Sequence, residues 1–209
     1  MKDYLSVAAE AECEYVIERS RFITHIAPVD GEEEAKAFVE KIRKAHSLAT
    51  HNCYAYIADE NGLKQKFSDD GEPQGTAGMP MLEVLKSHGL KKCAAVVTRY
   101  FGGVKLGAGG LVRAYAKAAA DGVRAAKIVK YVFCDFVRVG AGYETFPALL
   151  KFSEKKNYKI MDTQFSERAE AAFAVPREKR AAFEEDLAEA FGGKLRAENA
   201  GSGYYAFGE

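Results

Sequence analysis

The stretch Arg99-Tyr-Phe-Gly-Gly-Val-Lys-Leu-Gly-Ala-Gly-Gly-Leu111 contains five glycines and lies between two regular segments. Before it, residues 93–98 form a short apolar run that predicts a buried strand. After it, residues 111–126 are rich in alanine and predict a helix. The order strand, glycine-rich loop, helix therefore sets the centre of the first half of the chain.

Upstream of this stretch the pattern is also mixed. Residues 32–46 place apolar side chains on one helical face. Residues 53–59 and 63–68 flank an Asn-Gly turn and predict a hairpin. Residues 69–80 are rich in glycine and proline and predict a loop, after which Pro80 opens a short helix to Ser87.

Downstream, the pattern restarts near residue 129 with an order typical of a ferredoxin-like unit. It predicts a strand at residues 131–139, a helix at 142–156 and two strands at 158–164 and 168–175. A helix that starts at Pro176 and a last strand at 201–207 follow. We therefore predict an α+β protein of two small domains, residues 1–127 and 128–209.

Charge is unevenly distributed along the 209 residues, although 30 basic and 30 acidic side chains give a formal net charge of zero. Residues 1–40 have a net charge of −6. Residues 86–127, which we call the basic segment, contain nine bases and one acid and have a net charge of +8. Residues 128–209 are close to balanced. The zero average therefore does not exclude an anionic partner, because the positive charge is concentrated around the glycine-rich loop.

The glycine-rich loop and the helix after it form a candidate anion-binding site. Glycines let backbone N–H groups converge, and a helix N-terminus favours negative charge, most simply a phosphate. No Gly-Lys-Ser/Thr ends the loop, so it is not a Walker loop. The alternative is a tight turn whose bases pair with acids of the same domain. The candidate binding residues are Arg99, Tyr100, Gly102, Gly103, Lys105, Gly107, Gly109, Gly110, Arg113 and Lys117.

Three carboxylates, Asp69, Asp70 and Glu72, lie within four residues in the loop 69–80. They could hold Mg²⁺, act as acid and base, or form local turn hydrogen bonds. They could also pair with a base of the other loop. We favour pairing of Asp69 and Asp70 with Arg99 or Arg113, and we predict no metal site, because the histidines lack ligand spacing.

The cysteines and the first residues of the sequence indicate in which cellular compartment we expect the protein. Cys13, Cys53, Cys93 and Cys134 form no C-x-x-C pair, so we expect reduced, buried thiols. His51 and Cys53 could share a strand face, but a thiol in an apolar strand is inert, and we predict no catalytic residue. With an acidic start and no apolar stretch of about 18 residues, we expect a cytoplasmic protein without a signal peptide or a membrane span.

Two long motifs resemble the YigZ/IMPACT family: Ser68-Asp-Asp-Gly-Glu-Pro-Gln-Gly-Thr-Ala-Gly-Met-Pro80 and Val97-Thr-Arg-Tyr-Phe-Gly-Gly-Val-Lys-Leu-Gly-Ala-Gly-Gly-Leu-Val-Arg-Ala-Tyr115. The resemblance implies an IMPACT-type first domain with the β-α-β fold of ribosomal proteins and GHMP kinases. It implies a second domain similar to the last domain of elongation factor G. Kinase chemistry does not carry over, because Leu106-Gly-Ala-Gly-Gly-Leu111 lacks the serines of that phosphate loop.

Eukaryotic members of that family regulate translation by binding the activator of an initiation-factor kinase. We therefore expect a non-enzymatic, translation-associated binding protein without a cofactor, which contacts RNA or an acidic protein partner through its basic glycine-rich loop and helix. The expected partner is RNA, the ribosome or a translation-related protein. The alternative is a small-molecule enzyme that binds a phosphorylated ligand, with Asp69, Asp70 or Glu72 placing Mg²⁺ or a water. A third, purely structural reading is that the basic segment neutralises the acidic first forty residues.

Overall fold

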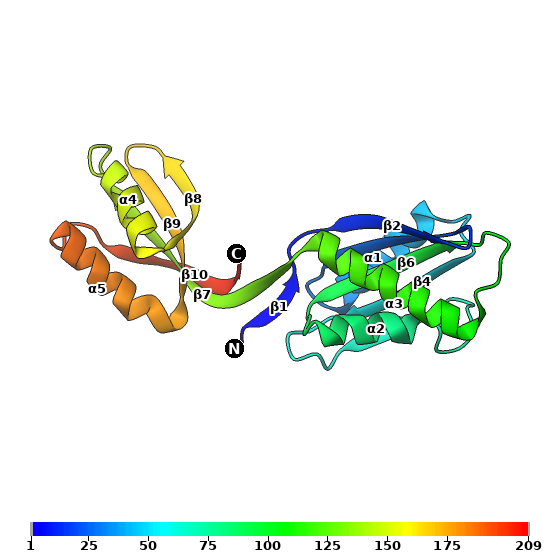
Figure 1. The fold of residues 1–209 in the computed structure, drawn as a ribbon. Helices are drawn as coiled ribbons and strands as arrows, with labels where there is room; N and C mark the ends of the chain where they lie inside the picture. Colours follow the sequence, from blue (N-terminus) through cyan, green and yellow to red (C-terminus); the bar gives the residue numbers. More distant parts are fainter. Residues whose placement is uncertain (1, 209) are drawn as a thin grey trace. The chain divides into compact units, whose positions relative to one another are not determined.

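The computed structural model describes residues 2–208 and divides them into two compact units. The first consists mainly of Asp3–Tyr131 and the second of Val132–Tyr205. Both combine helices with antiparallel strands (Figure 1), so the predicted α+β class is confirmed. None of the described helices is long and apolar enough to cross a membrane.

The first unit is built on an antiparallel five-stranded sheet with the order β2-β3-β6-β4-β5. Its strands are β2 (Ala11–Ile17), β3 (Ser20–Pro28), β4 (His51–Ile57), β5 (Gln65–Ser68) and β6 (Cys93–Tyr100). Strand β6 lies at the centre and is buried along nearly its whole length, which fits its continuous apolar run. The glycine-rich loop leaves from the end of this central strand.

Helices cover both faces of this sheet. On one face, α1 (Glu32–Ala45) buries Phe38, Val39 and Ile42 against the strands. On the other face, α2 (Gly78–Ser87) and α3 (Gly107–Ala126) share a second apolar core. The alanines of α3 let it approach the sheet closely. At Gly122 even a Cβ would lie 2.5 Å from the Thr24 side chain, so the closest approach requires glycine.

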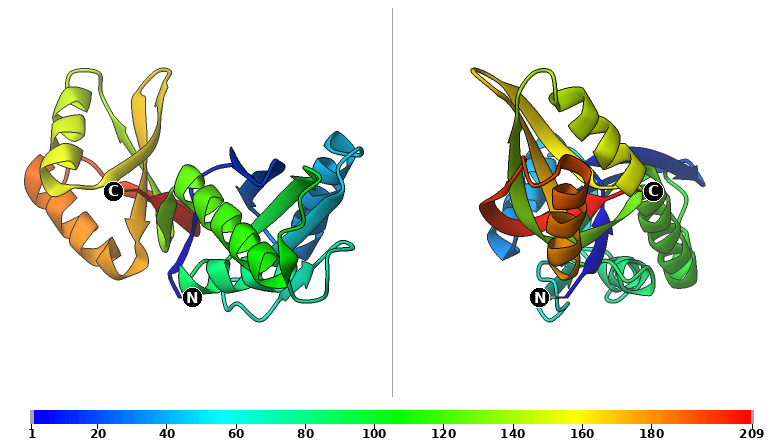
Figure 2. Two further views of the ribbon diagram at one scale, coloured as in Figure 1. Left: turned by 45° about the vertical axis from the view of Figure 1, so that its right-hand side comes forward. Right: turned by 90° about the vertical axis from the view of Figure 1, so that its left-hand side faces the viewer.

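The second unit follows the predicted β-α-β-β-α-β order. Its elements are β7 (Ile128–Ala141), α4 (Phe146–Lys156), β8 (Lys159–Phe165), β9 (Ala169–Pro176), the short 3-10 turn Arg177–Lys179, α5 (Arg180–Phe191) and β10 (Ala197–Phe207). Strand β9 pairs with β7 and β8, and β10 pairs with β7. Both helices lie on the same side of the strands (Figure 2) and pack Phe152 and Phe183 into one core with Phe173.

Strand β7 is long, and different parts of it pair with strands of the first and the second unit. Its start, Ile128 to Tyr131, pairs with β1 (Tyr4–Val7) in the first unit. Its remainder, Cys134 to Ala141, pairs with β9 in the second.

Several element boundaries differ from the sequence expectations. Helix α3 begins at residue 107 and not at 111, so that three glycines of the loop, Gly107, Gly109 and Gly110, belong to its first turn. Helix α4 begins at residue 146 and not at 142, and β10 begins at 197 and not at 201. The three strands between residues 4 and 28 were not predicted from sequence.

The four cysteines of the described residues form no disulfide with one another. Cys53, Cys93 and Cys134 are buried. The expectation of a buried thiol is wrong for Cys13, which is half-buried because β2 is the outer strand of its sheet.

Candidate functional site

The loop that contains Asp69, Asp70 and Glu72, which we call the acidic loop, is held in place by Asp69. The Asp69 carboxylate accepts hydrogen bonds from three backbone N–H groups. Oδ2 accepts from Gly75 at 2.8 Å, and Oδ1 accepts from Ala77 and Gly78 at 3.0 and 2.8 Å. Two of these donors lie at the start of α2, where helix N–H groups lack partners within the helix. Asp69 therefore fixes the loop to the helix, and both of its carboxylate oxygens accept hydrogen bonds from the backbone.

Replacing Asp69 by Ala removes these three acceptors at once. Unsatisfied buried donors and lost helix caps each cost free energy, so we expect the unfolding free energy of the first unit to fall by about 2 kcal/mol. Urea titration followed by amide NMR signals would measure the change for this unit. Asp69→Asn, which keeps one acceptor oxygen, should lose less; equal losses for both variants would contradict the capping role.

Asp70 joins the acidic loop to α1 and β4. Its Oδ1 lies 2.6 Å from Nη2 of Arg43, and its Oδ2 accepts the backbone N–H of Asn52 at 2.6 Å. The carbonyl oxygen of Asp70 accepts from Nδ1 of His51 at 2.8 Å in the tautomer that carries a proton there. This carboxylate also has its partners within the fold.

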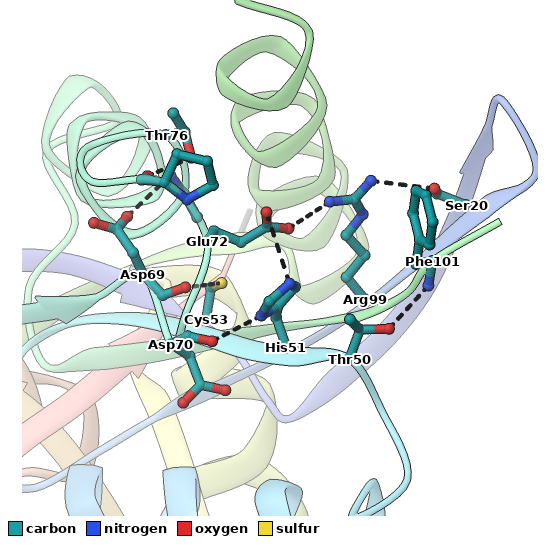
Figure 3. A network of polar contacts seen from close by, with 12 residues as sticks. Ser20, Thr50, His51, Cys53, Asp69, Asp70, Glu72, Thr76, Arg99 and Phe101 are labelled. Atoms are coloured by element: carbon teal, nitrogen blue, oxygen red, sulfur yellow. Dashed lines mark hydrogen bonds and ion pairs between the residues drawn. The ribbon is translucent and has the colours of Figure 1, made fainter. Parts of the chain in front are cut away.

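Glu72 forms the centre of a buried polar network (Figure 3). Its Oε1 accepts a hydrogen bond from Nη1 of Arg99 at 2.7 Å. The same oxygen accepts another from the hydroxyl of Tyr115 at 2.8 Å. The Glu72 and Arg99 side chains are 3% and 6% exposed. Removal of two charges from water is costly, so such a pair persists only when its geometry and added hydrogen bonds compensate.

The network extends from Arg99 into the β2–β3 turn. Nη2 of Arg99 donates to the hydroxyl oxygen of Ser20 at 3.3 Å, and the backbone N–H of Gly102 donates to the same oxygen at 3.2 Å. The guanidinium carbon lies 5.4 Å from the ring centres of Phe22 and Phe101. Arg99 thus connects the acidic loop, the turn and the first residues of the glycine-rich loop.

Tyr115 and Cys53 complete the network as neutral groups. Burial raises the pKa of the Tyr115 hydroxyl, which therefore stays protonated and donates to Glu72. Burial also raises the pKa of the Cys53 thiol, whose Sγ donates to the carbonyl oxygen of Asp69 at 2.9 Å. A buried thiol held in its protonated form is a poor nucleophile.

The prediction that Asp69 and Asp70 pair with Arg99 or Arg113 is wrong. Arg99 is joined to the acidic loop, but through Glu72. Asp69 binds backbone amides and Asp70 binds Arg43. Arg113 makes no ion pair within residues 2–208. The reason is the direction of the loop, which turns Glu72 inward between α3 and β6.

A hollow of about 630 Å³ lies beside the glycine-rich loop and is lined by residues of β2, that loop and α3. We call it the basic hollow; it is lined by Tyr15, Ile17, Glu18, Val104, Lys105, Leu106, Gly110, Arg113, Ala114 and Lys117. Lys105 and Arg113 are exposed and have no carboxylate partner in the described part of the chain. Nζ of Lys117 lies 4.7 Å from the ring centre of Tyr15 and 2.8 Å from Asp121.

Backbone N–H groups accompany these cations. Helix α3 begins at Gly107, and its N-cap residue, Leu106, makes no side-chain capping hydrogen bond. Gly103 and Gly107 have φ angles of 85° and 69°, which favour glycine. The uncapped N–H groups and the cations of the basic hollow together suit an anion.

The predicted binding residues therefore separate into two groups. Arg99 and Gly102 make interior contacts, and the hydroxyl of Tyr100 lies 3.0 Å from Nδ1 of His46. The others belong to the loop and helix beside the basic hollow: Gly103, Lys105, Gly107, Gly109, Gly110, Arg113 and Lys117. The candidate site residues chosen from the sequence did not include Ser20, Arg43 or the β2 side chains, although the alternation along residues 11–17 was a signal for that strand.

The described residues contain no group of three His, Cys, Asp or Glu side chains arranged to hold a metal ion. The three carboxylates of the acidic loop have protein partners for the reasons given above.

Together, these features define a two-unit α+β protein with a buried acidic–basic network beside an open, positively charged hollow. Residues 18–123 match the model of the Impact N-terminal domain, and residues 141–194 match a domain of unknown function, DUF1949. The chain belongs to the IMPACT family.

Relatives agree with this assignment. IMPACT family member YvyE of Bacillus subtilis is 43% identical over 93% of this chain and 89% of its own length. Protein IMPACT of Xenopus laevis is 37% identical over 43% of this chain and 30% of its own length. A solved structure described as a hypothetical protein is 36% identical, with a TM-score of 0.62 over 94% of this chain and 97% of the other.

Proposed function

We propose that this chain is a non-enzymatic, translation-associated binding protein whose basic hollow contacts an anionic partner. The partner's anionic groups are either RNA phosphates or the acidic side chains of a translation-related protein. Membership of the IMPACT family, whose eukaryotic members are translation regulators, supports an association with translation. Lys105 and Arg113 at the basic hollow are the observation that supports this contact surface.

The ion pairs formed by the bases of the basic segment support the choice of the basic hollow as the contact surface. Most of its other bases have a carboxylate nearby: Lys86 with Glu83, Lys92 with Asp30, Arg99 with Glu72, and Lys117 and Arg124 with Asp121. Lys105 and Arg113 lack one and line the same hollow. Neutralisation of the acidic first forty residues therefore does not account for these two cations. They attract an anion without first having to break an ion pair.

Binding of labelled single-stranded RNA and of a labelled poly-glutamate peptide, measured by fluorescence anisotropy, tests the proposal. We expect at least one of them to bind, and Lys105→Ala with Arg113→Ala to weaken that binding about tenfold or more at low salt. The variant should also show a shallower dependence on salt, because fewer counterions are released. Arg99 is unsuitable for this test, since its loss would disturb the buried network.

Lys151→Ala with Arg196→Ala is the matched control. It removes one exposed lysine and one exposed arginine from the second unit and so changes the net charge equally. Equal weakening by the two double variants would show a general charge effect and contradict a site at the basic hollow. Absence of binding to both probes would contradict the proposal as a whole.

A further inference from the structure

Strand β2 is one of the two outer strands of the first sheet. It pairs with β3 from Ala11–Ile26 to Ile17–Ser20, and no other described strand pairs with its second edge. Half of its backbone N–H and C=O groups therefore point away from the sheet. Such an edge can pair with an extended segment of another chain, and β2 has neither proline nor lysine to prevent this.

The basic hollow lies directly along this edge. Tyr15 and Ile17 line it from β2, and α3 contributes Gly110, Arg113, Ala114 and Lys117. Positions three, four and seven apart share one face of a helix, so these four residues form a single stripe beside the strand. A strand added to β2 would lie about 4.8 Å further out, and alternate side chains would enter the hollow.

Charge determines which side chains fit on each face of such a strand. Toward the hollow the added strand would meet three cations, Lys105, Arg113 and Lys117, which outnumber the single lining carboxylate of Glu18 and so favour acidic side chains. On the opposite face β2 presents Glu12 and Glu14; Glu14 is paired with Arg21, so the carboxylate of Glu12 is the one that disfavours acidic residues there. Acidic residues are therefore favoured at every second position, with neutral or basic residues between them.

We propose that β2 accepts an extended peptide segment of a partner protein, whose alternate acidic side chains enter the basic hollow. This inference rests on the proposed function and chooses a protein over RNA as the occupant of the site. A peptide satisfies both features of this surface, the open hydrogen-bonding edge and the cationic hollow. RNA phosphates would use only the second.

A capped peptide of alternating Thr and Glu, with as many residues as β2, is the probe. Two further versions carry N-methyl groups on the Thr nitrogens or on the Glu nitrogens. In an extended strand these two sets of nitrogens point to opposite edges, so one version blocks pairing with β2 and the other does not. A fourth peptide has the same composition with its Glu residues consecutive.

We expect the alternating peptide to bind in anisotropy measurements and one N-methylated version to lose about tenfold or more in affinity, while the other retains its affinity. The peptide with consecutive Glu residues should bind more weakly. Lys105→Ala with Arg113→Ala should weaken binding, whereas Lys151→Ala with Arg196→Ala should not. Bound peptide should also slow hydrogen exchange at β2 amides that lack a partner in β3.

Each other outcome has a definite meaning. Equal affinity of all four peptides would overturn strand pairing and leave an anion site at the basic hollow. Binding of single-stranded RNA without binding of any peptide would overturn this inference and favour RNA as the partner. If neither RNA nor any acidic peptide bound, both this inference and the proposed function would be wrong.

Discussion

Replacing Glu72 by Ala is expected to lower the unfolding free energy of the first unit by about 3–5 kcal/mol. The loss is large because the Arg99 charge would remain buried without its carboxylate, and the Tyr115 hydroxyl would lose its acceptor. The chain has no Trp, so urea unfolding followed by amide NMR signals is a suitable measurement. Signals of the second unit provide an internal reference.

Glu83→Ala is the matched control, since Glu83 forms an exposed pair with Lys86 at 2.8 Å. Exposed pairs contribute about 0–1 kcal/mol, so this variant should be nearly neutral. Replacing both Glu72 and Arg99 by apolar residues of similar size should cost less than Glu72→Ala alone, because no unpaired charge remains. A Glu72→Ala loss as small as that of Glu83→Ala would show that Arg99 finds another partner.

Local pattern was enough to predict the elements whose apolar residues repeat clearly. Helix α1 was expected over residues 32–46 and spans Glu32–Ala45, because Ala35, Phe38, Val39 and Ile42 share one face. The β-α-β-β-α-β order of the second unit was likewise visible, with boundaries displaced by a few residues. These elements depend mainly on the spacing of neighbours in the chain.

The partners of the acidic loop could not be predicted in the same way. Asp69, Asp70 and Glu72 are chemically similar and close in sequence, yet one binds backbone amides, one binds Arg43 and one binds Arg99. Which carboxylate faces which group depends on the path of the loop between β5 and α2. That path is fixed by contacts distant in sequence, which a local pattern does not contain.

The difference between Arg99 and Arg113 has a similar origin. Both belong to the basic segment, but Arg99 is 5% exposed and Arg113 faces the basic hollow. Strand β6 is buried on both faces, so alternation of apolar and polar residues gave no sign that Arg99 points inward. Only the pairing of β6 between β3 and β4 places this guanidinium beside Glu72.

Gly102→Ala is expected to destabilise the first unit by about 2–4 kcal/mol and to weaken binding at the basic hollow. A Cβ at this position would overlap with the carbonyl group of Arg19 and lie 2.5 Å from the backbone nitrogen of Ser20. These are backbone atoms, so the β2–β3 turn would have to move. Glu18 and Arg19 in that turn already have φ angles of 46° and 64°, which leaves them little freedom to adapt.

Gly109→Ala provides the matched control within the same loop and helix. A Cβ there would meet only the end of the Arg113 side chain at 3.5 Å, and Ala is the better helix former. We therefore expect this variant to be neutral or more stable by up to about 1 kcal/mol. Gly103→Ala meets no atom within 4 Å and should cost only the strain of its φ of 85°, about 1 kcal/mol. If Gly102→Ala cost no more than Gly103→Ala, the turn would be free to move, and Gly102 would not be what holds it against the glycine-rich loop.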